Sequence, residues 1–266
     1  MAEPYHLTND QVNFFKKNGF IKLKKVFSPG AVLKLRAELI NLLKKEFKVD
    51  PDKEAYDRFL SLEMTWPDNA LLRAYVLSPR LGQISANLLE VSAVRLYHDN
   101  VLAKQSGCGR TPWHFDDHHF PLDTNDVVTA WAPAQPTPIE MGPLSFAYPL
   151  DVHELIKDVT FEKTGTGYDR EVSNIFSKNN VNVNATPFEL GEVSFHHNLN
   201  FHTASSNRTN CSRIALANTY YRDGARVINS PTMVSGDWQK FMPNVKPGDV
   251  AASPLNPICW PVKSEI

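Results

Sequence analysis

The chain has 266 residues, of which 42% are hydrophobic, and its 28 basic and 29 acidic side chains leave a formal net charge of −1. This length and composition fit one domain with a sizeable core, and the balanced charge gives no electrostatic case for binding nucleic acid or an anionic membrane. The three cysteines are odd in number and far apart, which predicts reduced thiols and no disulfide framework.

The sequence shows neither a bilayer-spanning apolar stretch nor an N-terminal signal, and its last residues differ from a Ser-Lys-Leu peroxisomal signal. We therefore expect a cytoplasmic protein. The sequence leaves the choice between a monomer and a homodimer open.

The N-terminal part predicts helices around one short strand. Thr8 and Gln11 form a capping box at the start of a first helix, and Gly19 is its C-terminal stop. Residues 20–23 alternate as a strand does, and a longer helix is predicted over 29–47. The predicted packing face of that helix consists of Val32, Leu33, Leu35, Leu39, Leu42 and Leu43.

The segment that follows is predicted as a polar loop over 49–56 and helices over 69–76 and up to about residue 89. A β core is predicted to start near Val94. From there to Lys104 two sets of side chains alternate, so one set should line the interior of the core.

Further strands are predicted over 127–132 and 144–148. Between 154 and 184 the chain reads as a long irregular insert with Thr164–Gly167 and many asparagines. Loops of this length are often active-site lids or substrate-binding walls, and the alternative is a surface loop with no role.

A His-x-Asp pair carries the first chemical signal. His114 and Asp116 would project to the same side of a strand, and His202 follows much later, after a strand-like run. Two histidines and one carboxylate form the set that binds non-heme iron(II) on one face and leaves the other face open. A His-x-Asp pair alone is weak evidence, so the prediction depends on the joint pattern with His202 and the later Arg213.

The joint pattern resembles the phytanoyl-CoA dioxygenase family, over about Leu7 to Pro261. The stretches that carry the resemblance are Leu96–Asn100, Lys104, Thr111–Asp116, Val128–Trp131, Met141–Leu144, Gly191–His197, His202, Asn207, Arg213 and Asp223–Arg226.

The resemblance implies a mainly β fold with flanking helices (α+β): a double-stranded β-helix of the jelly-roll, cupin-like kind, with the N-terminal helices packed on its major sheet. We expect one domain, with helical support over 1–92, the β-helix core over 93–222 including the insert, and a C-terminal extension over 223–266.

The resemblance also implies the site residues and the reaction. His114, Asp116 and His202 would bind Fe(2+) and act in catalysis, while Arg213, Asn100 and Trp131 would hold the cosubstrate 2-oxoglutarate. The distal carboxylate of 2-oxoglutarate suits the planar, two-pronged guanidinium of arginine. With O2 as the second cosubstrate, such enzymes hydroxylate a substrate and release succinate and carbon dioxide. Candidates for the substrate wall are Asp117, His119, Phe120 and Arg222.

Several alternatives stay open. The same iron chemistry supports desaturation or ring closure, whereas halogenation is disfavoured because Asp116 is present where related halogenases carry a small residue. The dense 114–119 cluster would also suit a dinuclear hydrolase, and a binding protein that has lost catalysis is the third possibility. The favoured substrate is a small molecule such as a secondary metabolite, since no basic cluster suited to coenzyme A lies near the core strands.

Overall fold

Two antiparallel sheets form the body of the molecule in the computed structural model, which describes residues 3–53, 57–160, 167–231 and 237–261. The major sheet has the order β1-β8-β5-β10-β3-β11, and β2 also pairs with β3. Its strands are β1 (Phe20–Leu23), β2 (Phe59–Glu63), β3 (Val94–Lys104), β5 (Val127–Pro133), β8 (Val193–His197), β10 (Arg213–Arg222) and β11 (Ile258–Trp260). The minor sheet has the order β4-β9-β6-β7, with β4 (Thr111–His114), β6 (Leu144–Tyr148), β7 (Asn182–Asn184) and β9 (His202–Ala204).

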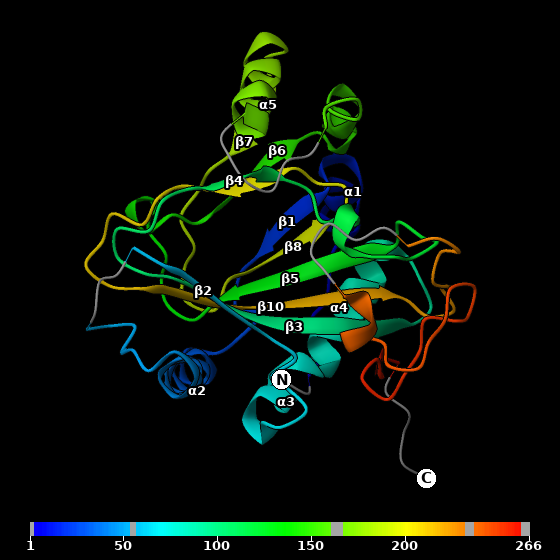
Figure 1. The fold of residues 1–266 in the computed structure, drawn as a ribbon, viewed down its shortest axis with the longest axis horizontal. Coiled ribbons are helices and arrows are strands. Elements are labelled where there is room, and N and C mark those ends of the chain that lie inside the picture. The colour runs from blue at the N-terminus through cyan, green and yellow to red at the C-terminus, as the bar shows by residue number, and fades with distance from the viewer. Residues whose placement is uncertain (1–2, 54–56, 161–166, 232–236, 262–266) are drawn as a thin grey trace.

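Helices cover the outer face of the major sheet, as Figure 1 shows for α2, α3 and α4, while α5 lies beyond the minor sheet. The helices are α1 (Asn9–Asn18), α2 (Pro29–Phe47), α3 (Ala70–Val76), α4 (Pro79–Leu89) and α5 (Gly167–Lys178). The largest apolar cluster joins these N-terminal helices to the major sheet. The predicted double-stranded β-helix with N-terminal helices on its major sheet is therefore confirmed.

The predicted boundaries of the first elements hold because their caps form. The side chain of Thr8 accepts a hydrogen bond from the backbone of Gln11, and Gly19 adopts the left-handed conformation at the end of α1. In α2, Val32, Leu35, Leu39 and Leu43 are buried. Leu33 was wrongly assigned to the packing face, since it is 63% exposed.

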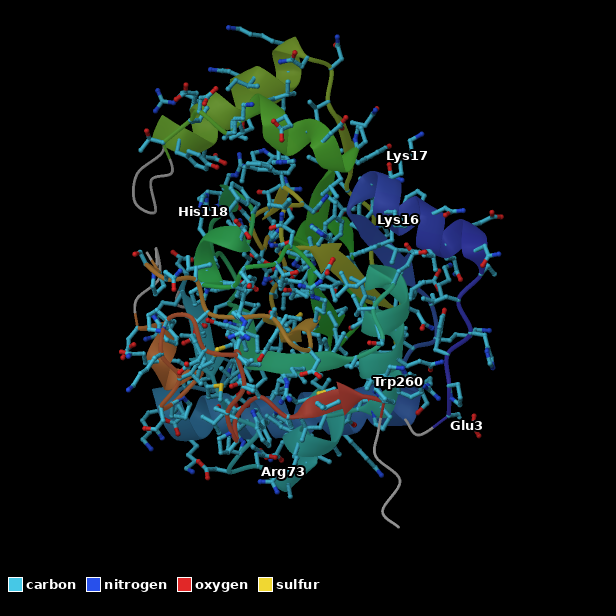
Figure 2. The ribbon with its side chains drawn as sticks, turned by 90° about the vertical axis from the view of Figure 1, so that its right-hand side faces the viewer. Glu3, Lys16, Lys17, Arg73, His118 and Trp260 are labelled. Atoms are coloured by element: carbon cyan, nitrogen blue, oxygen red, sulfur yellow. The ribbon has the colours of Figure 1, made fainter. Side chains whose placement is uncertain are left out.

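Two strands outside the predicted elements extend the major sheet. Strand β2 pairs with the second half of β3, and β11 pairs with the first residues of β3. Figure 2 shows Trp260 on β11, above the helix that carries Arg73. The C-terminal extension also supplies Trp238, Phe241 and Met242 to an apolar cluster around Tyr97, so it completes one end of the core.

The insert over 154–184 is more regular than predicted. It contains α5 and β7, and the stretch 161–166, with most of Thr164–Gly167, lies outside the described residues. Tyr168, Val172 and Phe176 of α5 pack with Trp113 of β4 in a separate apolar cluster. The side chain of Asp169 accepts a hydrogen bond of 2.8 Å from the backbone N–H of Trp113, which joins the insert to β4.

Within the described part of the chain, no helix combines the length and the apolar character needed to cross a bilayer.

Two leucines on opposite sides of α2 provide a test of this packing. Replacing Leu39, which is fully buried, by alanine should lower the free energy of unfolding by about 2–5 kcal/mol, because the side chain is lost and a cavity remains. Leu33→Ala, on the exposed side of the same helix, should change it by less than about 0.5 kcal/mol. Urea denaturation of both variants measures the difference, and equal losses would contradict the assigned faces.

Candidate metal centre and active site

Two histidines and one aspartate meet between the two sheets. His114, at the end of β4, lies opposite His202 of β9 in the strand register, and their ring centroids are 4.1 Å apart. The Nε2 atoms of His114 and His202 are 3.9 and 3.7 Å from Oδ1 of Asp116. One ligand atom from each residue lies within 4.8 Å of the other two, a spacing that fits a single ion with bonds of about 2 Å.

Asp116 reaches this position in a way that differs from the prediction. We expected it to share a strand face with His114, but β4 ends at His114 and Asp116 has φ −87° and ψ −14°. Its backbone N–H donates a hydrogen bond of 2.8 Å to the carbonyl of Asn198, so the chain turns here into the short helix η1 (Asp117–His119). The carboxylate therefore comes from a turn and not from strand alternation.

Backbone carbonyls fix the ring orientation and the tautomer of both histidines. The Nδ1 atom of His114 lies 2.9 Å from the carbonyl oxygen of Pro112, and Nδ1 of His202 lies 3.0 Å from that of Asn200. A proton on each Nδ1 satisfies these oxygens and leaves each Nε2 lone pair free for a metal. Burial, together with the neighbouring His114, holds the pKa of His202 well below its usual value, which favours the neutral ligand form.

The second oxygen of Asp116 is held by the major sheet. Oδ2 lies 3.3 Å from Nε2 of His196 and accepts a hydrogen bond of 3.4 Å from Thr129, whose hydroxyl is 2.9 Å from that of Thr219. Burial alone would raise the pKa of Asp116, but the surrounding imidazoles hold it well below its usual value. The carboxylate is thus ionised, and only Oδ1 faces the two metal-binding histidines.

A cavity of about 260 Å³ opens beside these three residues. Its lining includes most of the residues predicted from the sequence: His114, Asp116, His202, Asn100, Trp131, Arg213, His119 and Phe120.

Two predicted substrate-wall residues lie elsewhere. Asp117 accepts a hydrogen bond of 2.7 Å from Asn198 and lines a separate surface hollow, because η1 turns it away from the metal position. Arg222 stands at the far end of β10, with its guanidinium 3.5 Å from Asp126. The assignment of both residues to the substrate wall was therefore wrong. Figure 2 shows His118, which lies beside Asp117 in η1, between the α5 region above and the C-terminal extension below.

Arg213 is a buried cation with hydrogen-bond donors that the described residues do not use. It is 2% exposed, its Nη1 donates to the carbonyl of Gly142 at 2.5 Å, and its guanidinium carbon lies 5.3 Å from the ring centre of Trp131. The Nε of Arg213 and the Nε1 of Trp131 find no partner among the described residues, and no described carboxylate forms an ion pair with Arg213. Burial lowers the pKa of Arg213 to about 10, so the guanidinium stays charged at neutral pH.

Lys104, the register partner of Arg213, connects the ends of the two strands that carry the histidines. Its Nζ donates to the carbonyl oxygens of Gly109 at 2.8 Å, Ser205 at 2.9 Å and Ala204 at 3.4 Å. Gly109 precedes β4, and the other two residues close β9. The three carbonyls occupy the three donors of the ammonium group, which leaves Arg213 as the cation that faces the cavity.

Among the lining residues that were not predicted are Phe59, Glu63, His98 and Phe241. The alternation of β3 places His98 on the same face as Asn100, so that pattern was sufficient to find it. Nothing local in the sequence points to Phe241, because it reaches the cavity from the C-terminal extension by tertiary packing.

The alternative of a dinuclear hydrolase is not favoured. Among the described residues, His114, Asp116 and His202 are the one group whose spacing could hold a metal ion. Asp117, which would have to join a second ion, is directed to Asn198. The geometry therefore supports a mononuclear site of two imidazoles and one carboxylate, which fits iron(II).

The sequence matches the family described as phytanoyl-CoA dioxygenase (PhyH) over residues 15–215. The chain belongs to the phytanoyl-CoA dioxygenase family. A relative, the peroxisomal phytanoyl-CoA dioxygenase of Mus musculus, is 24% identical over 231 residues, which cover 79% of this chain and 67% of the relative.

Solved structures share the fold. The non-heme alpha-ketoglutarate-dependent carbocyclase SnoK from nogalamycin biosynthesis superposes with a TM-score of 0.77 at 24% identity, over 96% of this chain and 99% of its own. EctD from S. alaskensis, in complex with 2-oxoglutarate and 5-hydroxyectoine, gives a TM-score of 0.72 at 16% identity, over 93% and 87% of the two chains. Family membership and the His–Asp–His site identify this protein as a 2-oxoglutarate-dependent non-heme iron dioxygenase.

The adjacent aspartates give a matched test of the metal site. Asp116→Ala removes the one carboxylate ligand. It should weaken iron(II) binding at least about 100-fold, because the loss of a group that only contacts a ligand already lowers metal affinity by about 10- to 100-fold. Asp117→Ala, one residue along but outside the cavity, should leave the affinity within about threefold. Anaerobic titration with iron(II) measures both, and an Asp116→Ala protein with unchanged affinity would refute the site.

Proposed function

We propose that the protein hydroxylates an unactivated C–H bond of a small molecule, with His114, Asp116 and His202 as the iron ligands. The observation that carries this proposal is the buried, charged Arg213, which has no carboxylate partner among the described residues and lines the same cavity as the three ligands. A buried cation without a counter-ion is costly, and a dicarboxylate cosubstrate would supply the missing charge.

Different lining residues would bind different parts of 2-oxoglutarate. Arg213 would accept its distal carboxylate in a two-pronged contact, and Trp131 would offer its unpartnered indole N–H. Asn100 lines the same part of the cavity, where its side-chain oxygen accepts a hydrogen bond of 2.9 Å from Ser61. Ala215 and Ala217, on the same strand face as Arg213, leave room for the carbon chain.

When bound, iron(II) with 2-oxoglutarate and O2 supplies the oxidising power, and the cosubstrate leaves as succinate and carbon dioxide. The protein's own contribution is to hold three ligands on one face of the metal and to exclude bulk water. His196 and Thr129 keep Asp116 in place by binding the oxygen that does not face the histidines. Asp116 also occupies the position that a halide would need, which disfavours halogenation.

Ring closure is the second candidate outcome, because the name of SnoK, one of the solved structures with this fold, describes a carbocyclase. It uses the same metal site and differs only in the fate of the substrate after C–H cleavage. Product analysis by mass spectrometry separates the two outcomes, since hydroxylation adds an oxygen atom and ring closure removes two hydrogens.

A free small molecule fits the cavity better than a coenzyme A thioester. Arg213 is the one lysine or arginine among the residues that line the cavity, and the cosubstrate would occupy it. The phosphates of coenzyme A would therefore meet no basic group there. The free thiols Cys108, Cys211 and Cys259 support a reducing compartment, and we propose the cytoplasm, with a monomer or a homodimer as the working form.

Two arginines of β10 test the role of Arg213. In wild-type protein under anaerobic conditions, iron(II) and 2-oxoglutarate together should give a visible metal-to-ligand charge-transfer band. Arg213→Ala should raise the 2-oxoglutarate concentration needed for half of this band at least about tenfold, because a charged two-pronged contact is lost.

The control is Arg222→Ala, which removes an exposed arginine at the other end of the same strand and should leave the titration unchanged. If the wild-type protein formed no band, the proposed function would be wrong. An identical titration for Arg213→Ala and the wild type would refute the role of Arg213 alone.

A further inference from the structure

The cavity has a second end, away from Arg213. Across the major sheet, Thr219 of β10 is the register partner of His98 of β3, and Asn100, two residues further along β3, is the partner of Glu63 of β2. Thr219 hydrogen-bonds to Thr129, which contacts Asp116. His98, Thr219 and Thr129 therefore form one row across the sheet, and this row lies beside the metal ligands. Asn100, which is proposed to contact 2-oxoglutarate, lies closer to Arg213 than His98 does along β3, so the two ends of the cavity meet there.

Aromatic side chains surround His98. Its ring centroid is 4.8 Å from that of Phe241 and 6.3 Å from that of Phe120, and both phenylalanines line the cavity. Flat apolar rings of this kind favour a flat or alicyclic ligand, which buries apolar surface against them.

The charges at this end are already paired. Glu63 is 2.6 Å from Nζ of Lys240, which spans from β2 to the C-terminal extension. Arg213 lies at the opposite end and would be taken by the cosubstrate. The wall near His98 therefore presents no free cation for an anionic substrate and no free carboxylate for an ammonium group.

His98 brings a buried polar ring into this wall, and His119 also lines the cavity. The Nδ1 of His98 is buried and has no hydrogen-bond partner among the described residues, so the ring keeps unused hydrogen-bonding capacity at this atom. Burial lowers the pKa of His98 to about 4, which keeps the imidazole neutral at physiological pH. A neutral imidazole pairs well with a hydroxyl or carbonyl group.

We infer that His98 binds and orients the substrate, and that the substrate is an uncharged ring compound bearing a hydroxyl or carbonyl group. This inference rests on the proposed function, since the other end of the cavity is assigned to 2-oxoglutarate. The cavity volume of about 260 Å³ lies below the usual range for ligand pockets, roughly 300–1,000 Å³, and 2-oxoglutarate would take part of it. The part of the substrate near the iron is therefore small, of the size of one or two fused rings.

Four probes that share one ring system test the chemistry: tetralin, 1-tetralol, 1-aminotetralin and tetralin-1-carboxylate. Their dissociation constants are measured without oxygen, from the perturbation of the charge-transfer band of the protein loaded with iron(II) and 2-oxoglutarate. We expect 1-tetralol to bind at least about tenfold more tightly than the amine and the carboxylate, since a charged group would lose its hydration without gaining a partner.

Variants then separate a substrate contact from a structural role. His98→Leu should weaken 1-tetralol about tenfold, to the level of tetralin, and leave the affinities for tetralin and 2-oxoglutarate unchanged. His98→Gln keeps a hydrogen-bonding group and should recover part of the loss. His118→Leu removes a histidine outside the cavity and should match the wild type in every titration.

The outcomes are distinguishable. A missing charge-transfer band in the wild type would refute the proposed function and, with it, this inference. With the band present, three results would each overturn the inference alone: a carboxylate or amine that binds as tightly as the alcohol, no binding of 1-tetralol, or equal 1-tetralol affinity in His98→Leu and the wild type. If neither His98 variant folds, as judged by its melting temperature, the preference among the four probes in the wild type still decides the substrate class.

Discussion

The site depends on one cross-strand pair in the minor sheet and on its attachment to the major sheet. The register of β4 and β9 sets His114 opposite His202, and a slip of one residue would turn one imidazole to the other face of the sheet. The third ligand cannot come from that pair, because β4 ends at His114. Asp116 is instead fixed from across the interior by His196 and Thr129, so a metal bound here joins the two sheets as well as serving chemistry.

Buried charge is distributed unequally along the interior. Lys104 is fully occupied by three main-chain carbonyls, and Asp116 is surrounded by imidazoles. Arg213 alone keeps an unpartnered Nε and no described carboxylate partner. An incompletely satisfied buried cation lowers the stability of the empty protein, and a ligand that completes it raises stability by mass action. The same feature that weakens the fold therefore favours binding of a dicarboxylate.

The sequence was sufficient for the parts of the site that lie on regular strands. The family resemblance assigned Arg213, which lines the cavity, and strand alternation in β3 puts His98 on the same face as Asn100. It was insufficient where the backbone leaves a strand. The turn at Asp116 changes where Asp117 points, and Arg222 lies beyond a register shift between Thr219 and Tyr220 in the pairing with β3. Phe241 depends on how the C-terminal extension folds back, which no local pattern contains.

Strand geometry also explains why an arginine suits this position. Arg213 and Thr219 lie on the same face of β10 and are six residues apart, a separation of about 20 Å along an extended strand. Thr219 marks the row that contacts the metal ligands through Thr129. A five-carbon diacid held by the proposed iron site near that row would span only part of this distance, and the remainder would have to come from a long side chain that reaches back along the sheet. Arginine has both the length and the two-pronged head for the distal carboxylate, whereas a lysine has a single point of attachment and would leave one carboxylate oxygen unpaired in a dry cavity.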